Sequence, residues 1–144
     1  IADPDISICS DGSPTGFHPR GHGTFAKMIE LYVNERKVLS LPEAVRKMTS
    51  LPAKTLQITD RGVLREGMKA DLIIFDPSKV REKATYPDPF QFAEGFDLVI
   101  INGKVARENG TMVEEKAGAI LKPALATMQV ADPVHVAFIR GWTQ

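Results

Sequence analysis

Three side chains near the start of the sequence have types and a spacing suited to acid–base chemistry and anion binding. Asp11 follows the short apolar run from Ile6 to Cys9 and precedes a glycine, which predicts a carboxylate at the end of a strand and at the rim of a site. His18 and Arg20 lie in the loop that follows. A carboxylate on rigid backbone can act as a general base or a metal ligand, and a guanidinium can hold a substrate carboxylate through two parallel hydrogen bonds.

Each of these side chains also has an ordinary structural interpretation. An aspartate before a glycine often caps a turn, a loop histidine is usually solvated or hydrogen-bonded, and a surface arginine often binds loop backbone. His18 and His22 are four residues apart. Pro19 and Gly21 lie between them, so we do not expect a helical pair of zinc-binding histidines. The sequence contains no complete set of metal ligands, and a metal would have to draw on these two histidines and Asp11.

The elements that position these residues can be predicted from the spacing of apolar side chains. Residues 5–11 read as a strand, and apolar residues at helical spacing predict a helix from Thr24 to about Lys37. Ser40 and Glu43 have the spacing of a capping box, which predicts the start of a second helix. A proline in a first turn predicts a short third helix over residues 51–57.

The second half of the sequence changes to the pattern of strands. The apolar run 72–75 is bracketed by carboxylates, as in a strand that is covered on both faces, and a second run spans residues 97–101. The Asn-Gly pair at 102–103 predicts a hairpin into a strand over 104–107. A second Asn-Gly turn and a short strand follow over 109–113. We therefore expect a mainly antiparallel sheet.

The remaining segments are less regular. Two prolines exclude a central strand from residues 81–95, which we expect to form a loop over one face. Cys9 is the only cysteine, which excludes an internal disulfide, and we expect it to be a small buried hydrophobe. Alternating apolar residues at 134–138 resemble a strand without a clear end.

Composition narrows the classes of partner. The 144 residues are 43% hydrophobic and 25% charged, as in an ordinary soluble domain, and 18 basic residues balance 18 acidic ones. This balance gives no overall field for nucleic acid or an anionic membrane. No apolar run approaches the roughly 20 residues of a membrane-spanning helix, and the start lacks the basic residues of a secretory signal. We expect a cytoplasmic protein with neither nucleic acid nor membrane as a partner.

Several motifs occur in an order that resembles the C-terminal part of the amidohydrolase superfamily. The resemblance is greatest to its N-acyl-D-amino-acid deacylase branch, the D-aminoacylases, and covers Asp5 to about Pro123. The motifs are Ser-Asp-Gly at 10–12, His-Pro-Arg at 18–20, Gly-Thr-Phe at 23–25, Leu-Pro-Glu-Ala-Val-Arg-Lys-Met-Thr at 41–49, Gly-Met-Lys-Ala-Asp-Leu at 67–72 and Asn-Gly-Lys at 102–104. Their shared order is more specific than any one motif.

The resemblance implies a mixed α+β fold in three parts. Residues 1–60 would be the last strand and the following helices of a (β/α)8 barrel, and residues 61–122 the C-terminal strands of a small β-sandwich. Residues 123–144 form a tail without a counterpart. We expect the chain to be the C-terminal part of a larger enzyme.

The resemblance also implies a reaction, which is zinc-dependent hydrolysis of the amide bond of N-acyl-D-amino acids. Asp11 is similar to the aspartate that takes a proton from the zinc-bound water and passes it to the leaving amine, and it is also a possible metal ligand. Arg20, together with His18 in the same motif, would bind the α-carboxylate of the substrate.

The family holds its metals mainly through residues on earlier barrel strands, which this sequence lacks. We therefore expect the segment alone to bind no zinc and to be inactive, and we expect it to self-associate or to pair with a complementing chain. The alternative is a non-catalytic α+β binding or assembly module from the same superfamily. Nucleic-acid binding has little support, because the sequence has no basic stripe with aromatic residues.

Overall fold

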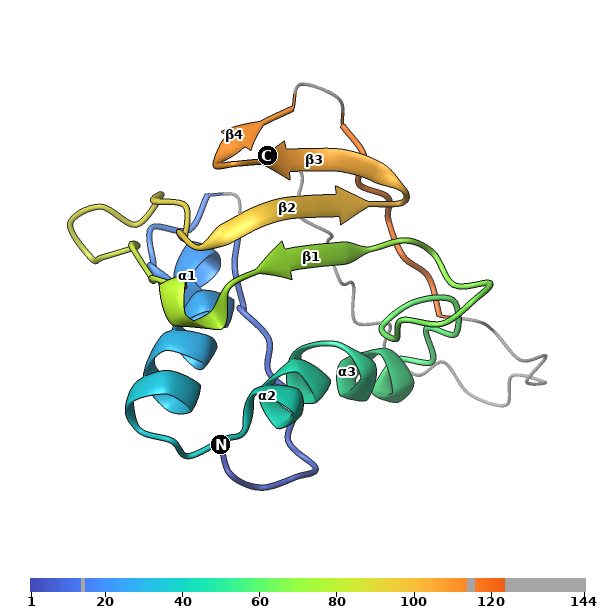
Figure 1. Cartoon of the computed structure of the whole chain (residues 1–144), viewed down its shortest axis with the longest axis horizontal. Helices are drawn as coiled ribbons and strands as arrows, with labels where there is room; N and C mark the ends of the chain where they lie inside the picture. Colours follow the sequence, from blue (N-terminus) through green and yellow to red (C-terminus); the bar gives the residue numbers. More distant parts are fainter. Residues whose placement is uncertain (14, 114–115, 124–144) are drawn as a thin grey trace.

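Helices occupy the first half of the chain and strands the second (Figure 1). The computed structural model describes residues 1–13, 15–113 and 116–123. The helical elements are α1 (Arg20–Lys27), the π-helix η1 (Met28–Glu35), α2 (Leu41–Met48), α3 (Ser50–Thr55) and the 3-10 helix η2 (Pro77–Lys79). The strands are β1 (Leu72–Phe75), β2 (Phe96–Ile101), β3 (Lys104–Glu108) and β4 (Thr111–Met112). This arrangement confirms the prediction of a mixed α+β fold.

The four strands form one antiparallel sheet in the order β1-β2-β3-β4. Asn102 and Gly103, at the turn between β2 and β3, have φ values of 51° and 79°, and Asn109 and Gly110, between β3 and β4, have φ values of 48° and 83°. Two successive left-handed residues are typical of the tight turn whose twist matches that of the flanking strands. Both predicted hairpins are confirmed.

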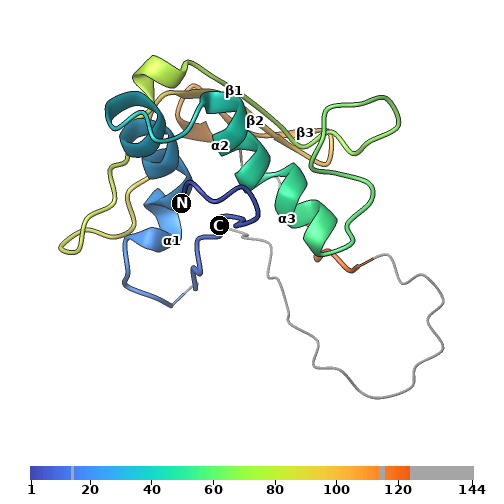
Figure 2. The ribbon, with the colours of Figure 1, turned by 90° about the horizontal axis from the view of Figure 1, so that it is seen from below.

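The core joins the helices to one end of β1 and β2. Ala26, Ile29 and Val80 form one buried cluster, against which Phe75 and Phe96 pack. A second cluster lies within the helical half and consists of Met28, Leu39 and Ala44. Figure 1 shows β1 nearest to α2 and α3 and β4 farthest from them, and Figure 2 shows the same layers from below. Most of the sheet therefore extends beyond the helices.

The segment 5–11 is irregular, so the predicted strand is wrong. A strand needs a neighbouring strand for its main-chain hydrogen bonds. The described sheet consists of β1 to β4 and does not include this segment. The segment instead runs beside α2, where the amide of Ile8 donates to the carbonyl of Lys47 at 2.9 Å. The buried ammonium of Lys47 donates to the carbonyl of Asp3. Cys9 is exposed, contrary to the expectation that it would be buried.

The first helix begins at Arg20, four residues before the predicted start at Thr24. The hydroxyl of Thr24 donates to the carbonyl of Arg20 at 2.8 Å, so Thr24 lies inside the helix and does not cap it. Because α1 begins early, it includes Gly21 and His22, which the sequence analysis placed in a loop. Pro19 and Gly21 do not prevent a helix here, since Pro19 lies at the N-cap and proline is tolerated at the beginning of a helix.

The predicted cap of the second helix is half confirmed. The hydroxyl of Ser40 accepts the amide of Glu43 at 3.4 Å. The carboxylate of Glu43 does not reach back, because it accepts from Arg46 at 2.7 Å and 2.8 Å. This hydrogen bond with Arg46 is the main reason why the pKa of Glu43 lies below its ordinary value.

The strand β1 is less covered than its apolar sequence predicts. Ile73 and Ile74 point to opposite faces, since neighbouring residues of a strand alternate, and both are 56% exposed. Cover on both faces is thus absent within the described residues. The alternating segment 134–138 lies outside the described residues. None of the described helices is long and apolar enough to cross a bilayer.

Candidate functional site

Asp11 and Arg20 form an ion pair at the beginning of α1. Nη2 of Arg20 lies 2.6 Å from Oδ2 of Asp11, and Nε of Arg20 donates to the Asp11 carbonyl at 3.4 Å. Asp11 has a φ of 47°, a left-handed conformation that aspartate tolerates better than most residues. Its side chain is 75% exposed and that of Arg20 is 48% exposed. The pair is therefore accessible to a ligand while each side chain restrains the other.

His18 connects this pair to a second loop. Its Nδ1 accepts the main-chain amide of Arg20 at 3.1 Å. Its Nε2 lies 3.2 Å from the hydroxyl of Tyr86, and the two rings meet edge to face at 5.1 Å and 69°. The structure thus brings together all three residues that the sequence analysis selected, and adds Tyr86.

The loop that carries Tyr86 packs against the beginning of α1 through its aromatic side chains. The ring of Phe90 lies 5.4 Å from that of Phe17 and 5.5 Å from that of His22. Phe92 lies 6.0 Å from His22 and carries the guanidinium of Arg107 over its face at 5.5 Å. Sequence reasoning did not assign these aromatic residues to the site. The signal that could have identified the loop residues is the density of aromatic side chains on either side of Pro87 and Pro89.

The residues near Asp11 do not fit a complete metal centre. In the described ranges, no three His, Cys, Asp or Glu side chains gather where they could hold a metal ion. The nearest candidates were His18 and His22, but Nδ1 of His18 is occupied by the Arg20 amide and His22 packs against Phe90. Asp11 therefore offers at most one carboxylate ligand.

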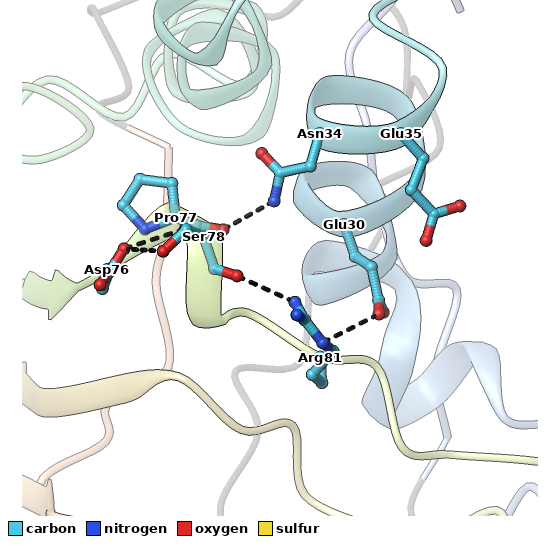
Figure 3. A pocket seen from close by; sticks show the side chains of 7 residues that line it. All are labelled: Glu30, Asn34, Glu35, Asp76, Pro77, Ser78 and Arg81. Carbon is cyan, nitrogen blue, oxygen red and sulfur yellow. Dashed lines mark hydrogen bonds and ion pairs between the residues drawn. The ribbon is translucent and has the colours of Figure 1, made fainter.

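A hollow of about 640 Å³ lies elsewhere, between η1 and η2 (Figure 3). The side-chain amide of Asn34 donates to the carbonyl of Pro77 at 2.7 Å, and Nε of Arg81 lies 3.7 Å from Oε1 of Glu30. Hydrogen bonds from the Ser78 hydroxyl and amide lower the pKa of Asp76. The contacts of Asn34 with Pro77 and of Glu30 with Arg81 join the π-helix to the segment after β1. The residues that line the hollow are Glu30, Asn34, Glu35, Asp76, Pro77, Ser78 and Arg81.

The sequence is similar to those of N-acyl-D-amino-acid deacylases. It is 38% identical over 122 residues to an N-acyl-D-aspartate deacylase of Alcaligenes xylosoxydans xylosoxydans, a match that covers 83% of this chain and 24% of that protein. It is 36% identical over 116 residues to a D-aminoacylase of the same organism, covering 79% of this chain and 24% of the relative. The chain spans about a quarter of the length of these relatives.

Solved structures of deacylases also match this chain. A crystal structure of D-aminoacylase matches with a TM-score of 0.76 and 36% identity, over 81% of this chain and 25% of that one. An N-acyl-D-glutamate deacylase from Bordetella bronchiseptica matches with a TM-score of 0.71 and 35% identity, over 76% of this chain and 24% of that one. That enzyme is complexed with zinc and a phosphonate inhibitor that mimics the tetrahedral intermediate of the reaction. A further D-aminoacylase structure is described as having a binuclear metal center.

The family model agrees with these matches. The model of the amidohydrolase family covers residues 5–107, which include Asp11, His18, Arg20, β1, β2 and all but the last residue of β3. The predicted resemblance is confirmed by the sequence and structural matches as well as by the family model. The chain belongs to the amidohydrolase family.

Proposed function

We propose that this chain forms the C-terminal part of a metal-dependent hydrolase that cleaves the amide bond of N-acyl-D-amino acids. The observation that carries the proposal is the accessible ion pair of Asp11 and Arg20, with 2.6 Å between Oδ2 and Nη2. The names of the relatives, which are deacylases of N-acyl-D-amino acids, support the substrate class. We also propose that residues 1–60 correspond to the end of a barrel and residues 61–122 to a β-sandwich.

In this proposal Asp11 moves the proton. Hydrolysis adds water to the amide carbon and breaks the bond between this carbon and nitrogen, so a proton must leave the water and reach the leaving nitrogen. The carboxylate of Asp11 is exposed, and it is held by Arg20 in a fixed position. Such a carboxylate can accept the proton as a general base and return it as a general acid.

Arg20 binds the substrate carboxylate. Its guanidinium has five N–H groups, of which Asp11 uses one on Nη2 and the one on Nε. The others remain in reach of a second carboxylate because the side chain is 48% exposed. His18 contributes by accepting the amide of Arg20, which fixes the first residue of α1. The substrate would thus be held with its amide close to Asp11.

Zinc belongs to the proposal for the complete enzyme. The described residues do not form a metal centre, so its ligands would come from other side chains. We therefore assign Asp11 and Arg20 the proton transfer and the carboxylate binding, and no step that involves the metal.

The substrate specificity of the complete protein that contains this chain tests the proposal. N-acetyl-D-glutamate, N-acetyl-D-aspartate and N-acetyl-D-leucine are assayed beside their L-enantiomers and beside the D-compounds whose α-carboxylate is converted to a primary amide. We expect hydrolysis of at least one D-substrate, and little hydrolysis of its L-enantiomer or its amide. Equal rates for a D-substrate and its α-amide would contradict the role of Arg20.

The alternative is a non-catalytic binding or assembly module. The absence of a metal-ligand cluster in the described residues favours it. Metal analysis of the purified protein separates the two functions when it is combined with the assay. A deacylase should contain zinc in stoichiometric amount and hydrolyse the substrate, whereas a module should do neither.

A further inference from the structure

The hydroxyl of Tyr86 lies at the outer end of a chain of hydrogen bonds that reaches Arg20. Tyr86 contacts Nε2 of His18 at 3.2 Å, and Nδ1 of His18 accepts the amide of Arg20 at 3.1 Å. Arg20 in turn holds Asp11. We infer that Tyr86 is a positioning residue that orients Arg20 toward the substrate carboxylate by fixing the ring of His18. This inference rests on the proposed function of Arg20.

The direction of each hydrogen bond follows from the chemistry of the groups. A main-chain amide can only donate, so Nδ1 of His18 must be the acceptor in its contact with Arg20. A neutral imidazole then carries its proton on Nε2. Nε2 consequently donates to the hydroxyl oxygen of Tyr86. Tyr86 thus supplies a partner for Nε2 in the one neutral form of His18 that can cap the amide of Arg20.

The position of His18 explains why its ring affects Arg20. Only Pro19 separates the two residues, and its φ of −58° is fixed by the proline ring. The amides in the first turn of a helix have no partner inside the helix, and Pro19 makes no side-chain cap. The imidazole of His18 takes over this role for the first residue of α1. A rotated His18 ring would leave the amide of Arg20 without this partner at the point where its side chain departs toward Asp11.

The loop of Tyr86 is anchored well enough to hold the ring. At its base, Arg81 and Glu94 exchange main-chain hydrogen bonds of 3.2 Å and 3.0 Å. Arg107, on β3, donates to the carbonyl of Ala93 at 3.0 Å. The anchored loop brings Tyr86 to His18 across 68 residues of sequence. The loop therefore links β3 to the start of α1 through the contact between Tyr86 and His18.

A kinetic comparison of Tyr86→Phe with the wild type tests the inference, in the complete protein that contains this chain. The variant keeps the ring contact with His18 and loses only the hydroxyl. Tyr32→Phe, on η1, is the matched control. Because one hydrogen bond is lost, we expect KM for the N-acyl-D-amino acid to rise about fivefold in Tyr86→Phe. We expect kcat to stay within about twofold and Tyr32→Phe to behave as the wild type.

A spectroscopic measurement shows whether the effect passes through His18. Imidazole nitrogen chemical shifts, assigned with His18→Gln, report the tautomer in the neutral ring. We expect the Nε2-protonated form in the wild type, and a mixture of both forms in Tyr86→Phe. An unchanged tautomer or an unchanged KM in an active Tyr86→Phe variant would overturn the inference alone. A wild type without hydrolysis of any N-acyl-D-amino acid would overturn the proposed function, and the inference with it.

Discussion

At the scale of single residues, the guanidinium of Arg20 is the group on which the proposed substrate contact depends. We predict that Arg20→Met raises KM for the N-acyl-D-amino acid by about 10- to 100-fold, because a hydrogen bond to a charged group contributes about 1.5–3 kcal/mol. Arg20→Lys should raise KM by an intermediate amount, since lysine keeps the positive charge but cannot form the two parallel hydrogen bonds of a guanidinium. Steady-state kinetics provides the measurement.

Arg65→Met is the control for this substitution. Arg65 is an exposed arginine in the connection between α3 and β1, so its replacement should leave KM unchanged. If Arg20→Met and Arg65→Met gave the same KM, Arg20 would not bind the substrate carboxylate.

Sequence reasoning identified the residues that lie close together in the chain. Asp11, His18 and Arg20 lie within ten positions, and the structure places them in contact with one another, although the sequence did not predict their hydrogen bonds. Tyr86 was not predicted as a site residue, because its contact with His18 depends on how a loop 68 residues farther along the chain folds back. Such tertiary contacts leave no periodic pattern in the sequence.

At the scale of elements, the acid sensitivity of α2 follows from Glu43. Its hydrogen bond with Arg46 lowers its pKa, so the ionised form stabilises the folded state. This contribution is complete above the pKa that Glu43 has in the unfolded chain and is lost as the pH falls through the lower folded value. We predict that the difference in Tm between wild type and Glu43→Gln shrinks between about pH 6 and about pH 3.

Thermal unfolding at several pH values checks this prediction. Glu66→Gln, in the exposed loop before β1, serves as the control and should show no such trend. A difference between Glu43→Gln and wild type that stayed constant down to the lowest pH would contradict the role of the Arg46 pair.

Elements defined by local chemistry were predictable, and those defined by distant partners were not. The two Asn-Gly turns require left-handed backbone, which the residue types themselves favour, and both formed as predicted. The cap of α2 by Ser40 is equally local. Residues 5–11 have a strand-like pattern, but a strand also needs a neighbour, and none of the described strands lies beside them.

At the scale of the whole molecule, the exposed apolar surface of β1 predicts association. Ile73 and Ile74 are both 56% exposed, on opposite faces of the sheet. We predict that the 144-residue chain self-associates at high concentration, or binds a complementing chain, because burial of these side chains removes apolar surface from water. The double variant Ile73→Lys/Ile74→Lys should shift the chain toward a monomer in light scattering.

Glu66→Lys, which changes the charge by the same amount at an exposed position outside the strands, is the control and should leave the mass unchanged. A wild-type chain that stayed monomeric at high concentration, with no partner recovered, would show that the exposed faces of β1 need no cover.

The central claim is that Asp11 carries the proton in amide hydrolysis, and the rate of Asp11→Asn in the complete protein tests it most directly. The amide keeps the size of the side chain but cannot accept the proton. We predict that kcat/KM for an N-acyl-D-amino acid falls about 10²- to 10⁴-fold, while Asp97→Asn, an exposed aspartate on β2, retains the wild-type value. Equal kcat/KM values for Asp11→Asn and wild type would contradict the account.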